Sequence, residues 1–522
     1  MNHAGPLWLV LAPALAAPLL LALARRRVAG LGALVALVAA ATFASTVGLA
    51  PAVLAHGRVV ATLPAVLGEL RFTLDGVGLL FALVATFAWT IASVYATGYL
   101  HGDAHAPRYH ATSLAVLSAM LGVVVAGDLI TLYVFFEWLG LVAYLYVVHV
   151  GGPVAERAGL KYLVLTLLGG FAVLAGALLV DLLGGGDLTQ PLLLDPTHPG
   201  LRATAALLLV LGFGVKAGAL GLHLWLPDAH SAAPAPASAL LSGVMIKAGA
   251  YGILRTLAGL YGGGTAAPSG EALALAVLWW GVATMSIGVV MALAQTHAKR
   301  LLAYSSVSQM GFVLAGFGAA AYLADHGAVG WTGSLLHVAN HALAKGLLFL
   351  GVGAAVHATG ETDLRRLGGL ARRMPWTFAA VLIGAGGIAG LPGLNGFVSK
   401  SVLHHTLVHA AEHGGAPGLV GAEWIFVATT VGTAAALVKL VAMAFLGRPA
   451  VARPVQEAPW TMRAPMLVAA GAIVALGVAP GALAPLLASA AAALRPTGAP
   501  DVAGVAAWVG APIGHAADLR AA

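Results

Sequence analysis

Long apolar runs follow one another along almost the whole chain, separated by short polar stretches. A membrane core of about 30 Å needs about 20 apolar residues per helix, and fourteen segments reach that length. They lie near residues 6–24, 28–55, 72–98, 111–127, 129–150, 161–183, 201–226, 236–261, 272–294, 301–323, 330–357, 376–410, 423–446 and 464–491. Membrane barrel strands would instead be alternating segments of about ten residues. The pattern therefore predicts an all-α polytopic membrane protein with about fourteen transmembrane helices.

Composition supports this interpretation. The 522 residues are 60% hydrophobic and only 9% charged, with a mean hydropathy of +0.94. Soluble domains carry about 25% charged residues, so an ordinary soluble enzyme is excluded. The absence of cysteine excludes a disulfide framework, a thiolate metal site and a cysteine-ligated iron–sulfur cluster within this chain.

Lysine and arginine are distributed unevenly between alternate loops. The side that holds Arg25–Arg27 has fifteen of the 26 basic residues, the other side with the C-terminal tail has six, and five lie inside spans. The remaining members of the first group are Arg108, Arg157, Lys161, Lys299, Arg300, Arg365, Arg366, Arg372, Arg373, Arg448, Arg453 and Arg463. The group of six is Arg58, Arg71, Arg202, Arg255, Arg495 and Arg520.

The positive-inside rule makes the basic side cytoplasmic and places both termini outside. The basic residues follow the first span, which is typical of an uncleaved helix and not of a signal peptide. We expect a prokaryotic cytoplasmic (inner) membrane. The positive charge gathers on one membrane side, so nucleic-acid binding is not expected.

Several spans contain ionisable residues, which cost at least about 2.5–3.5 kcal/mol each at the centre of a membrane helix. The candidates are Glu137, Lys216, Lys247, His337, His341, Lys345 and Lys400. The spacing of four between His337, His341 and Lys345 keeps them on one helical face. Lys439 is open to two interpretations, snorkelling or function, whereas snorkelling is preferred for Lys299 and Arg300 at the interface.

These residue types suit proton transfer. Desolvation lowers the pKa of a lysine and a nearby carboxylate raises it, while histidine titrates near neutral pH without such tuning. A membrane chain of such groups favours ion translocation, and we find no matching assembly for bond-breaking catalysis. The chain is therefore expected to be a non-catalytic subunit that translocates ions.

Two spans contain helix breakers close to an ionisable residue. Gly218, Gly221 and Pro227 follow Lys216, and a second set precedes Lys400. The second set is Gly390, Pro392, Gly393 and Gly396. Interrupted helices at corresponding places indicate two inverted five-helix repeats. The expected domains are helices 1–3 (1–109), the first repeat (110–261), the second repeat (272–446), and helix 14 with the tail (447–522).

From about residue 110 to 405 the sequence resembles the proton-translocating, antiporter-like membrane subunits of respiratory complex I, Mrp-type cation/proton antiporters and group 4 membrane-bound hydrogenases. The motifs that carry the resemblance are FFEWLG, KAGALGLHLWLPDAHSAAPAPASALLSG, THAKRLLAYSSVSQMGF, LLHVANHALAKGLLFL and GLPGLNGFVSK. The family has fourteen helices with two inverted five-helix units, each with a broken helix. Its seventh helix usually has a proline where this chain has Gly221, so we expect a softer break here.

The resemblance also implies residue roles. Glu137 and Lys216 would form the interacting pair of the first half-channel, and Lys400 would lead to the outlet. Lys247, His337, His341 and Lys345 would form the central axis. Accessory positions are Lys161, His223, Asp228 and Lys439. We interpret Asp75 as structural and expect no long lateral helix in the tail, residues 492–522.

The leading hypothesis is a proton-conducting subunit of a multisubunit complex, driven by redox chemistry in other subunits that carry flavin, iron–sulfur or nickel–iron centres. The chain itself is expected to bind no cofactor and no metal, and we interpret His404, His405, His409 and His413 as a polar exit region. One alternative is a subunit of a Na⁺(K⁺)/H⁺ antiporter. Another is a membrane partner that supplies proton flux to a soluble protein handling inorganic carbon.

Overall fold

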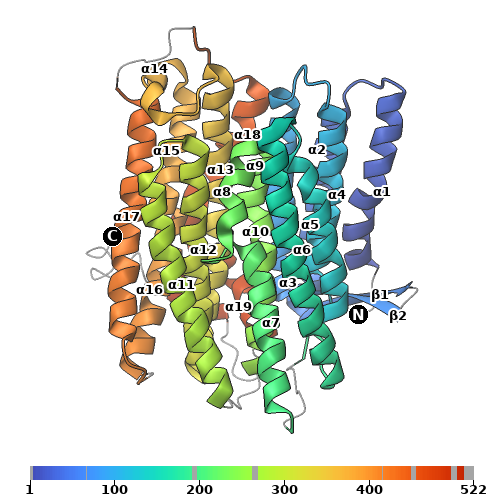
Figure 1. Ribbon diagram of the computed structural model, residues 1–522, viewed down its shortest axis with the longest axis vertical. Helices are drawn as coiled ribbons and strands as arrows, with labels where there is room; N and C mark the ends of the chain where they lie inside the picture. Colours follow the sequence, from blue (N-terminus) through green and yellow to red (C-terminus); the bar gives the residue numbers. More distant parts are fainter. Residues whose placement is uncertain are drawn as a thin grey trace.

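The computed structural model describes residues 4–65, 68–190, 197–261, 268–413, 415–447, 454–494 and 502–510. Its helices run side by side in one elongated bundle (Figure 1). The first half contains α1 (Gly5–Arg25), α2 (Leu31–His56), α3 (Gly76–Tyr99), α4 (Ala106–Val124), α5 (Leu129–Val147), α6 (Gly152–Leu182), α7 (Pro199–Ala217), α8 (Leu226–Ala232), α9 (Ala235–Leu240) and α10 (Ile246–Tyr261). The second half contains α11 (Pro268–Ala294), α12 (Ala298–Tyr322), α13 (Ala328–Thr359), α14 (Leu370–Arg373), α15 (Pro375–Ala389), α16 (Asn395–His413), α17 (Leu419–Phe445), α18 (Trp460–Val478), α19 (Ala484–Leu494) and α20 (Val502–Gly510).

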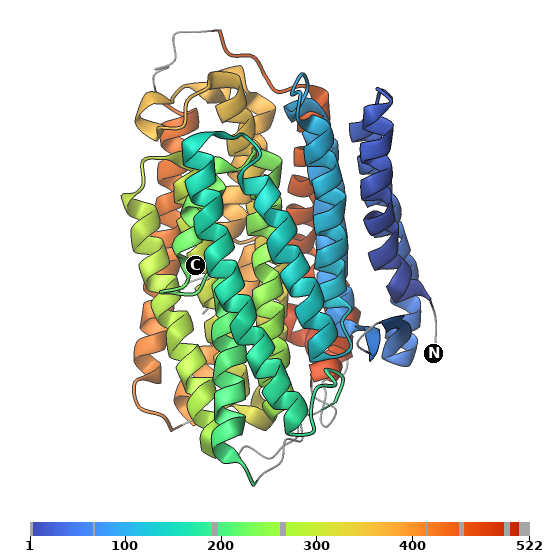
Figure 2. The same cartoon turned by 45° about the vertical axis from the view of Figure 1, so that its right-hand side comes forward.

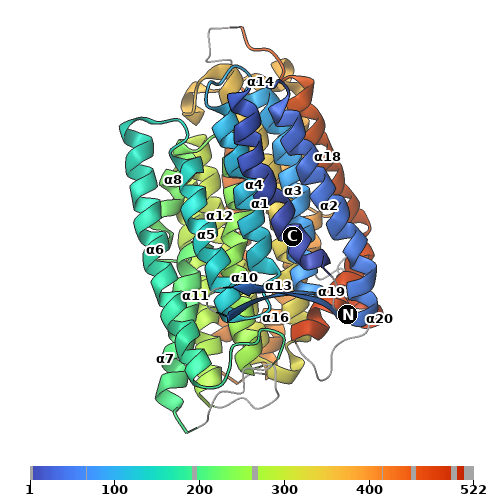
Figure 3. The same cartoon turned by 90° about the vertical axis from the view of Figure 1, so that its right-hand side faces the viewer.

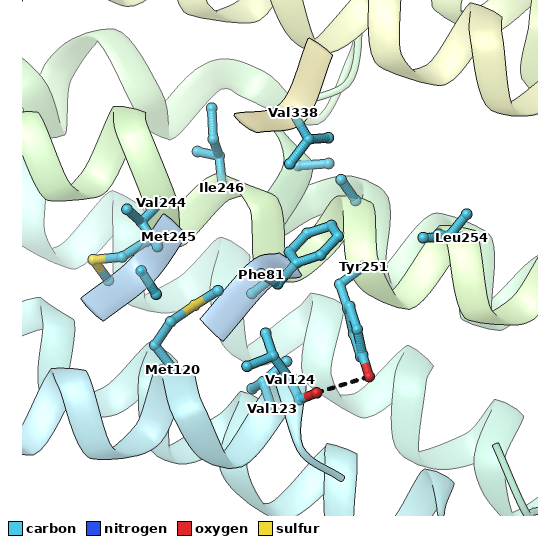
Figure 4. Close-up of a cluster of buried hydrophobic side chains, with 14 of the residues drawn as sticks. Phe81, Met120, Val123, Val124, Val244, Met245, Ile246, Tyr251, Leu254 and Val338 are labelled. Atoms are coloured by element: carbon cyan, nitrogen blue, oxygen red, sulfur yellow. Dashed lines mark hydrogen bonds between the residues drawn. The ribbon is translucent and has the colours of Figure 1, made fainter. Parts of the chain in front are cut away.

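The interior of the bundle is formed by α9 and α10 together, by α12 and by α13. The apolar windows of these segments are 100%, 94% and 72% buried within the chain, against 28% and 22% for α1 and α2. The dark blue helix α1 stands at the edge of the bundle in Figure 2. The close-up in Figure 4 shows one part of the core, where Phe81 and Met120 pack beside Val244, Met245 and Ile246.

Both predicted helix breaks are confirmed. Helix α7 ends at Ala217, and Gly218 and Gly221 have φ angles of 71° and 85°. Helix α15 ends at Ala389, before Gly390 and Gly393 at 88° and 83°. Glycine populates this left-handed region without the steric cost that other residues meet.

The expectation of a soft break at Gly221 was wrong. Residues 218–222 leave the helix completely before the 3₁₀ turn η1 (His223–Trp225) and α8 begin. Two positive-φ glycines within four residues explain why no proline is needed there. The structure also contains a π-helical turn, η2 (Leu241–Met245), between α9 and α10, which the sequence pattern did not predict.

The helix count of fourteen remains a prediction. Within the described residues, twelve helices are long and apolar enough to cross a membrane. The two other predicted spans correspond to α4 and to the broken pair α15–α16. The last predicted span, 464–491, is interrupted at Pro480, which separates α18 from α19. The inverted repeats and the four domain boundaries likewise remain predictions.

The chain is not entirely helical, because a β-hairpin joins α2 to α3. Its strands, β1 (Arg58–Ala65) and β2 (Gly68–Asp75), are antiparallel, with Arg58 opposite Asp75. The predicted third span began at residue 72, but residues 72–75 belong to β2. The hairpin lies at the lower end of the bundle, opposite α14 (Figures 1 and 3).

Asp75 starts α3 and also holds a buried arginine. Its carboxylate accepts a hydrogen bond of 2.8 Å from the Gly78 amide and two from Arg255, of 2.7 and 2.8 Å. Arg255 also donates to the Tyr251 hydroxyl, which donates to the Val124 carbonyl (Figure 4). The assignment of Arg255 to an outer loop was therefore wrong, because it lies in α10 and is 4% exposed. Arg448, Arg453, Arg495 and Arg520, also used for orientation, lie outside the described residues.

We expect Arg255→Ala to lower the free energy of unfolding by about 3–5 kcal/mol, because it leaves the Asp75 carboxylate buried without its cation. Chemical unfolding of the purified protein in detergent measures this loss. The double variant Asp75→Ala, Arg255→Ala should lose less than the single one. Arg365→Ala removes an exposed partner of Asp363 and should leave the free energy nearly unchanged.

Candidate functional site

The first cluster lies where α5, α6 and α7 meet. Lys216, the penultimate residue of α7, is 2% exposed, and its Nζ donates a 2.7 Å hydrogen bond to the Tyr162 hydroxyl on α6. The ammonium group also lies 5.0 Å from the centroid of the Tyr162 ring, a cation–π distance. The break at Gly218 thus places a lysine at a helix end inside the bundle, with a hydroxyl as its acceptor.

Glu137 on α5 points at the backbone of α6. A Cβ atom built on Gly170 would coincide with Glu137 Oε1, so the absence of a side chain at Gly170 makes room for the carboxylate. Glu137 Oε1 is buried and has no hydrogen-bond partner among the described residues. Glu137 lies close enough to Lys216 to interact electrostatically, but these two described residues form no ion pair. They are neighbours without direct contact.

Glycines allow neighbouring helices to pack closely against α7, the helix that carries Lys216. A Cβ at Gly169 of α6 would meet Val215, and one at Gly212 of α7 would meet the carbonyl of Gly169. On the other side, a Cβ at Gly249 of α10 would meet the backbone of Ala217. Close approach of backbones through small residues is how membrane helices pack tightly. The end of α7 is therefore held firmly between α6 and α10.

The central cluster joins α10, α12 and α13. Lys247 Nζ donates to the Ser242 carbonyl at 2.7 Å, and Lys345 Nζ donates to the Leu302 carbonyl at 3.1 Å. Both lysines are buried, with exposed fractions of 1% and 0%. The hydroxyl oxygens of Ser242, in the turn before α10, and Ser306, on α12, are 2.6 Å apart.

Two histidines continue the polar face of α13. The rings of His337 and His341 are stacked with centroids 6.2 Å apart. His337 Nδ1 lies 3.0 Å from the Ser399 hydroxyl on α16, while neither ring nitrogen of His341 has a hydrogen-bond partner in the described part of the chain. The three side chains of the predicted face, His337, His341 and Lys345, are all buried, and Lys345 contacts α12 while His337 contacts α16.

Lys400 lies on α16, after the second break. It is 5% exposed, and its Nζ lies 5.0 Å from the centroid of the Phe312 ring. No hydrogen-bond partner for this Nζ is found among the residues that the structure describes. A Cβ on Gly390 would come within 3.3 Å of Lys400 Cδ, so the glycine of the break also makes room for the lysine.

The accessory residues divide into different environments. Asp228 on α8 binds two cations, Lys161 of α6 at 2.9 Å and Arg300 of α12 at 2.7 Å, and all three are partly exposed. Lys439 donates to the carbonyls of Leu293 and Gln295, so it caps the C-terminus of α11. The ring of His223 lies 6.3 Å from that of Tyr304.

The histidines of α16 lie between its middle and its C-terminus. His404 Nε2 is 3.2 Å from Glu423 Oε1 on α17, and the His404 and His405 rings are 6.1 Å apart. The rings of His409 and His326 are stacked at 6.1 Å. The side chain of His413 lies outside the described part. These contacts place a polar region next to α17.

Sequence reasoning missed the uncharged partners. Tyr162, Ser242, Ser306 and Ser399 each contact a predicted site residue or its partner, and none was singled out. Hydroxyl groups within otherwise apolar spans were the available signal, since buried polar atoms need partners. A spacing rule could not select among them, because their partners come from other helices.

The fold and these clusters define a polytopic membrane protein with several buried ionisable side chains in its interior. Residues 126–414 match the family model described as NADH:quinone oxidoreductase/Mrp antiporter. Residues 68–110 match the NADH-ubiquinone oxidoreductase (complex I), chain 5 N-terminus. The chain belongs to this family of antiporter-like membrane subunits.

Relatives of known sequence agree with the assignment. An uncharacterised protein of Mycobacterium tuberculosis is 36% identical over 474 residues, covering 85% of this chain and 70% of the relative. Hydrogenase-4 component B of Escherichia coli is 34% identical over 437 residues, covering 80% of this chain. That match extends over 63% of the E. coli protein.

Solved structures show the same fold. A chain of the Mrp complex from a Dietzia species matches with a TM-score of 0.82 at 24% identity, over 96% of this chain and 99% of that one. A chain of respiratory complex I from Thermus thermophilus with bound NADH matches with a TM-score of 0.79 at 26% identity, over 94% and 99%. Both come from multisubunit membrane complexes.

We expect Gly170→Ala to lower the free energy of unfolding by about 1–3 kcal/mol, because the added methyl group overlaps the Glu137 carboxylate in a packed interior. A double-mutant cycle with Glu137→Ala, measured by unfolding in detergent, should remove most of this cost. Equal costs of Gly170→Ala with and without the Glu137 side chain would contradict the contact. Gly471→Ala, at an exposed α18 position with open space around it, should cost nothing.

Proposed function

We propose that this chain conducts protons through the membrane along Glu137, Lys216, Lys247, His337, His341, Lys345 and Lys400, as a subunit of a larger complex. The observation that carries the proposal is the set of four lysines, each at most 5% exposed. None of them forms an ion pair with a carboxylate of the described residues. A buried ionisable residue within a membrane span is expensive and marks a transport path.

The chemistry of these groups supports protons as the transported species. A desolvated lysine holds or releases a proton according to the charges around it, and histidine accepts and donates a proton near neutral pH. The buried and unpartnered atoms Glu137 Oε1 and Lys400 Nζ, with both ring nitrogens of His341, offer places where a transferred proton can arrive. The path therefore has acceptors in both halves of the chain.

Sodium or potassium exchange is the second candidate, because one matched structure comes from an Mrp complex. A hard cation prefers several oxygen ligands. The path offers mainly nitrogen donors, and the buried carboxylate of Asp75 is already bound to Arg255. The site residues thus favour protons over metal cations.

Redox chemistry in other subunits would drive the flux. We place the end of the bundle with Arg25–Arg27 and α14 on the cytoplasmic side of a prokaryotic inner membrane, since basic residues gather in its loops. Support for a redox partner comes from the match to hydrogenase-4 component B and the likeness to a complex I chain. Flavin, iron–sulfur or nickel–iron centres would then lie in those partners.

Lys216→Ala and Glu137→Gln should each abolish substrate-driven proton flux in inverted membrane vesicles that contain the native complex, because each removes a protonatable group from the path. Flux is followed with a pH-sensitive dye, and assembly is checked by the yield of the intact complex. Leu211→Ala, on the exposed face of the same helix, serves as the matched control and should retain flux. Full flux in both path variants would refute the proposal.

The partner is identified by purifying the complex in mild detergent through a tag on this chain, followed by mass spectrometry. We expect subunits with flavin, iron–sulfur or nickel–iron centres. Recovery of small membrane subunits alone, with sodium-dependent proton movement in vesicles, would replace the redox pump by an antiporter. Recovery of a large soluble zinc protein would point to inorganic carbon, and a lone monomer would contradict all three.

A further inference from the structure

Lys247 and Lys345 come from different halves of the chain, and each is held by a backbone carbonyl. Lys247 on α10 reaches Ser242, and Lys345 on α13 reaches Leu302 of α12. A carbonyl accepts a hydrogen bond but has no proton to pass on. These two hydrogen bonds therefore hold the ammonium groups in place but provide no route for a proton from one lysine to the other.

The π-helical turn supplies the first of these anchors. In η2 the regular α-helical hydrogen bonds are interrupted, and such turns occur frequently at functional sites. Ser242 lies in this turn, five residues before Lys247, so its carbonyl can face the lysine ammonium group. A Cβ at Gly243 would lie 3.1 Å from the Ala342 carbonyl, so the glycine permits close packing of the turn on α13.

A pair of hydroxyl groups bridges the space between the two anchors. Ser242 Oγ and Ser306 Oγ are 2.6 Å apart, and both side chains are completely buried. Ser306 donates at 2.9 Å to the Leu302 carbonyl, the same oxygen that accepts from Lys345. Since Ser306 uses its only hydrogen there, Ser242 is the donor between the two hydroxyls.

We propose that the Ser242–Ser306 pair is the proton-transfer link between Lys247 and Lys345, and so between the two halves of the chain. The inference rests on the proposed function, since it assigns a route to the same protons. Lys247 donates to the carbonyl of Ser242 itself. Lys345 donates to the Leu302 carbonyl, which also accepts from Ser306. The link requires each lysine side chain to rotate, so that its Nζ passes from the carbonyl to the neighbouring serine hydroxyl.

One proton crosses the link in a balanced sequence. The Ser306 hydroxyl first turns from the Leu302 carbonyl toward Ser242 Oγ, and the Ser242 hydroxyl turns toward Lys247. Lys345 then gives a proton to Ser306 Oγ, and Ser306 gives its own hydrogen to Ser242 Oγ. Ser242 then gives its hydrogen to the neutral amine of Lys247. Each hydroxyl ends with one hydrogen, and the net change is one proton moved from Lys345 to Lys247. Transfer in the reverse direction uses the same atoms.

A purely structural role for these serines is the competing explanation. Serine within a helix commonly donates to the carbonyl four residues earlier, as Ser306 does. Ser308 provides the matched comparison, since it lies on the same helix, is equally buried, and donates at 2.9 Å to the Met285 carbonyl of α11. Ser308 contacts neither lysine, so it has the packing role without the proposed link.

The test uses substrate-driven proton flux of the native complex in inverted vesicles. Ser306→Ala and Ser242→Ala should each lower flux at least about tenfold, because a positioned proton-transfer group contributes about 10²-fold or more to a rate. Ser308→Ala should retain flux, and Ser306→Thr, which keeps the hydroxyl, should restore it. The double variant of Ser242 and Ser306 should be no worse than either single one, since both belong to one link.

Unfolding measurements accompany each variant, so that a loss of flux in Ser306→Ala at the stability of Ser308→Ala excludes a structural cause. A loss smaller than tenfold in both single variants, or an equal loss in Ser308→Ala, overturns the link. Lys216→Ala in the same assay separates the two proposals. If it loses flux while the serine variants keep it, only the link fails; if it also keeps flux, the proposed function fails as well.

Discussion

A buried ammonium group in a membrane protein must find its hydrogen-bond acceptor within the protein, and much of this structure follows from that requirement. Lys216 has a tyrosine hydroxyl, Lys247 and Lys345 have backbone carbonyls, and Lys400 has the face of Phe312. None of these acceptors is a carboxylate. Because their partners are uncharged, the lysines are stabilised less firmly than in ion pairs, which suits groups that exchange protons.

Irregular backbone supplies room for these charges. The two glycine breaks place Lys216 and Lys400 beside non-helical segments, and the π-turn at Ser242 frees a carbonyl for Lys247. Irregular backbone within a membrane is tolerated only where protein or a polar cavity surrounds it. The most deeply buried helices, α9, α10 and α12, accordingly surround the central cluster.

Other charges in the chain have a different purpose. The Asp75–Arg255 pair ties the start of α3 to α10, and Lys439 caps α11. Asp228 joins Lys161 and Arg300 and so connects α6, α8 and α12 at the basic end of the bundle. Apart from Lys439, each of these side chains has an opposite charge as its partner. The central lysines and histidines form no ion pair among the described residues, and this difference separates the structural charges from the proposed path.

The sequence by itself determined the helical membrane fold, the positions of both breaks and the list of costly ionisable residues. Apolar length, glycine and charge act locally, and they can be read along the chain. Only the tertiary structure decided that Glu137 faces Gly170, that Arg255 is buried against Asp75, and that Ser242 meets Ser306. Such contacts join residues 33 to 180 positions apart, and the packing of helices, which no local pattern encodes, brings them together.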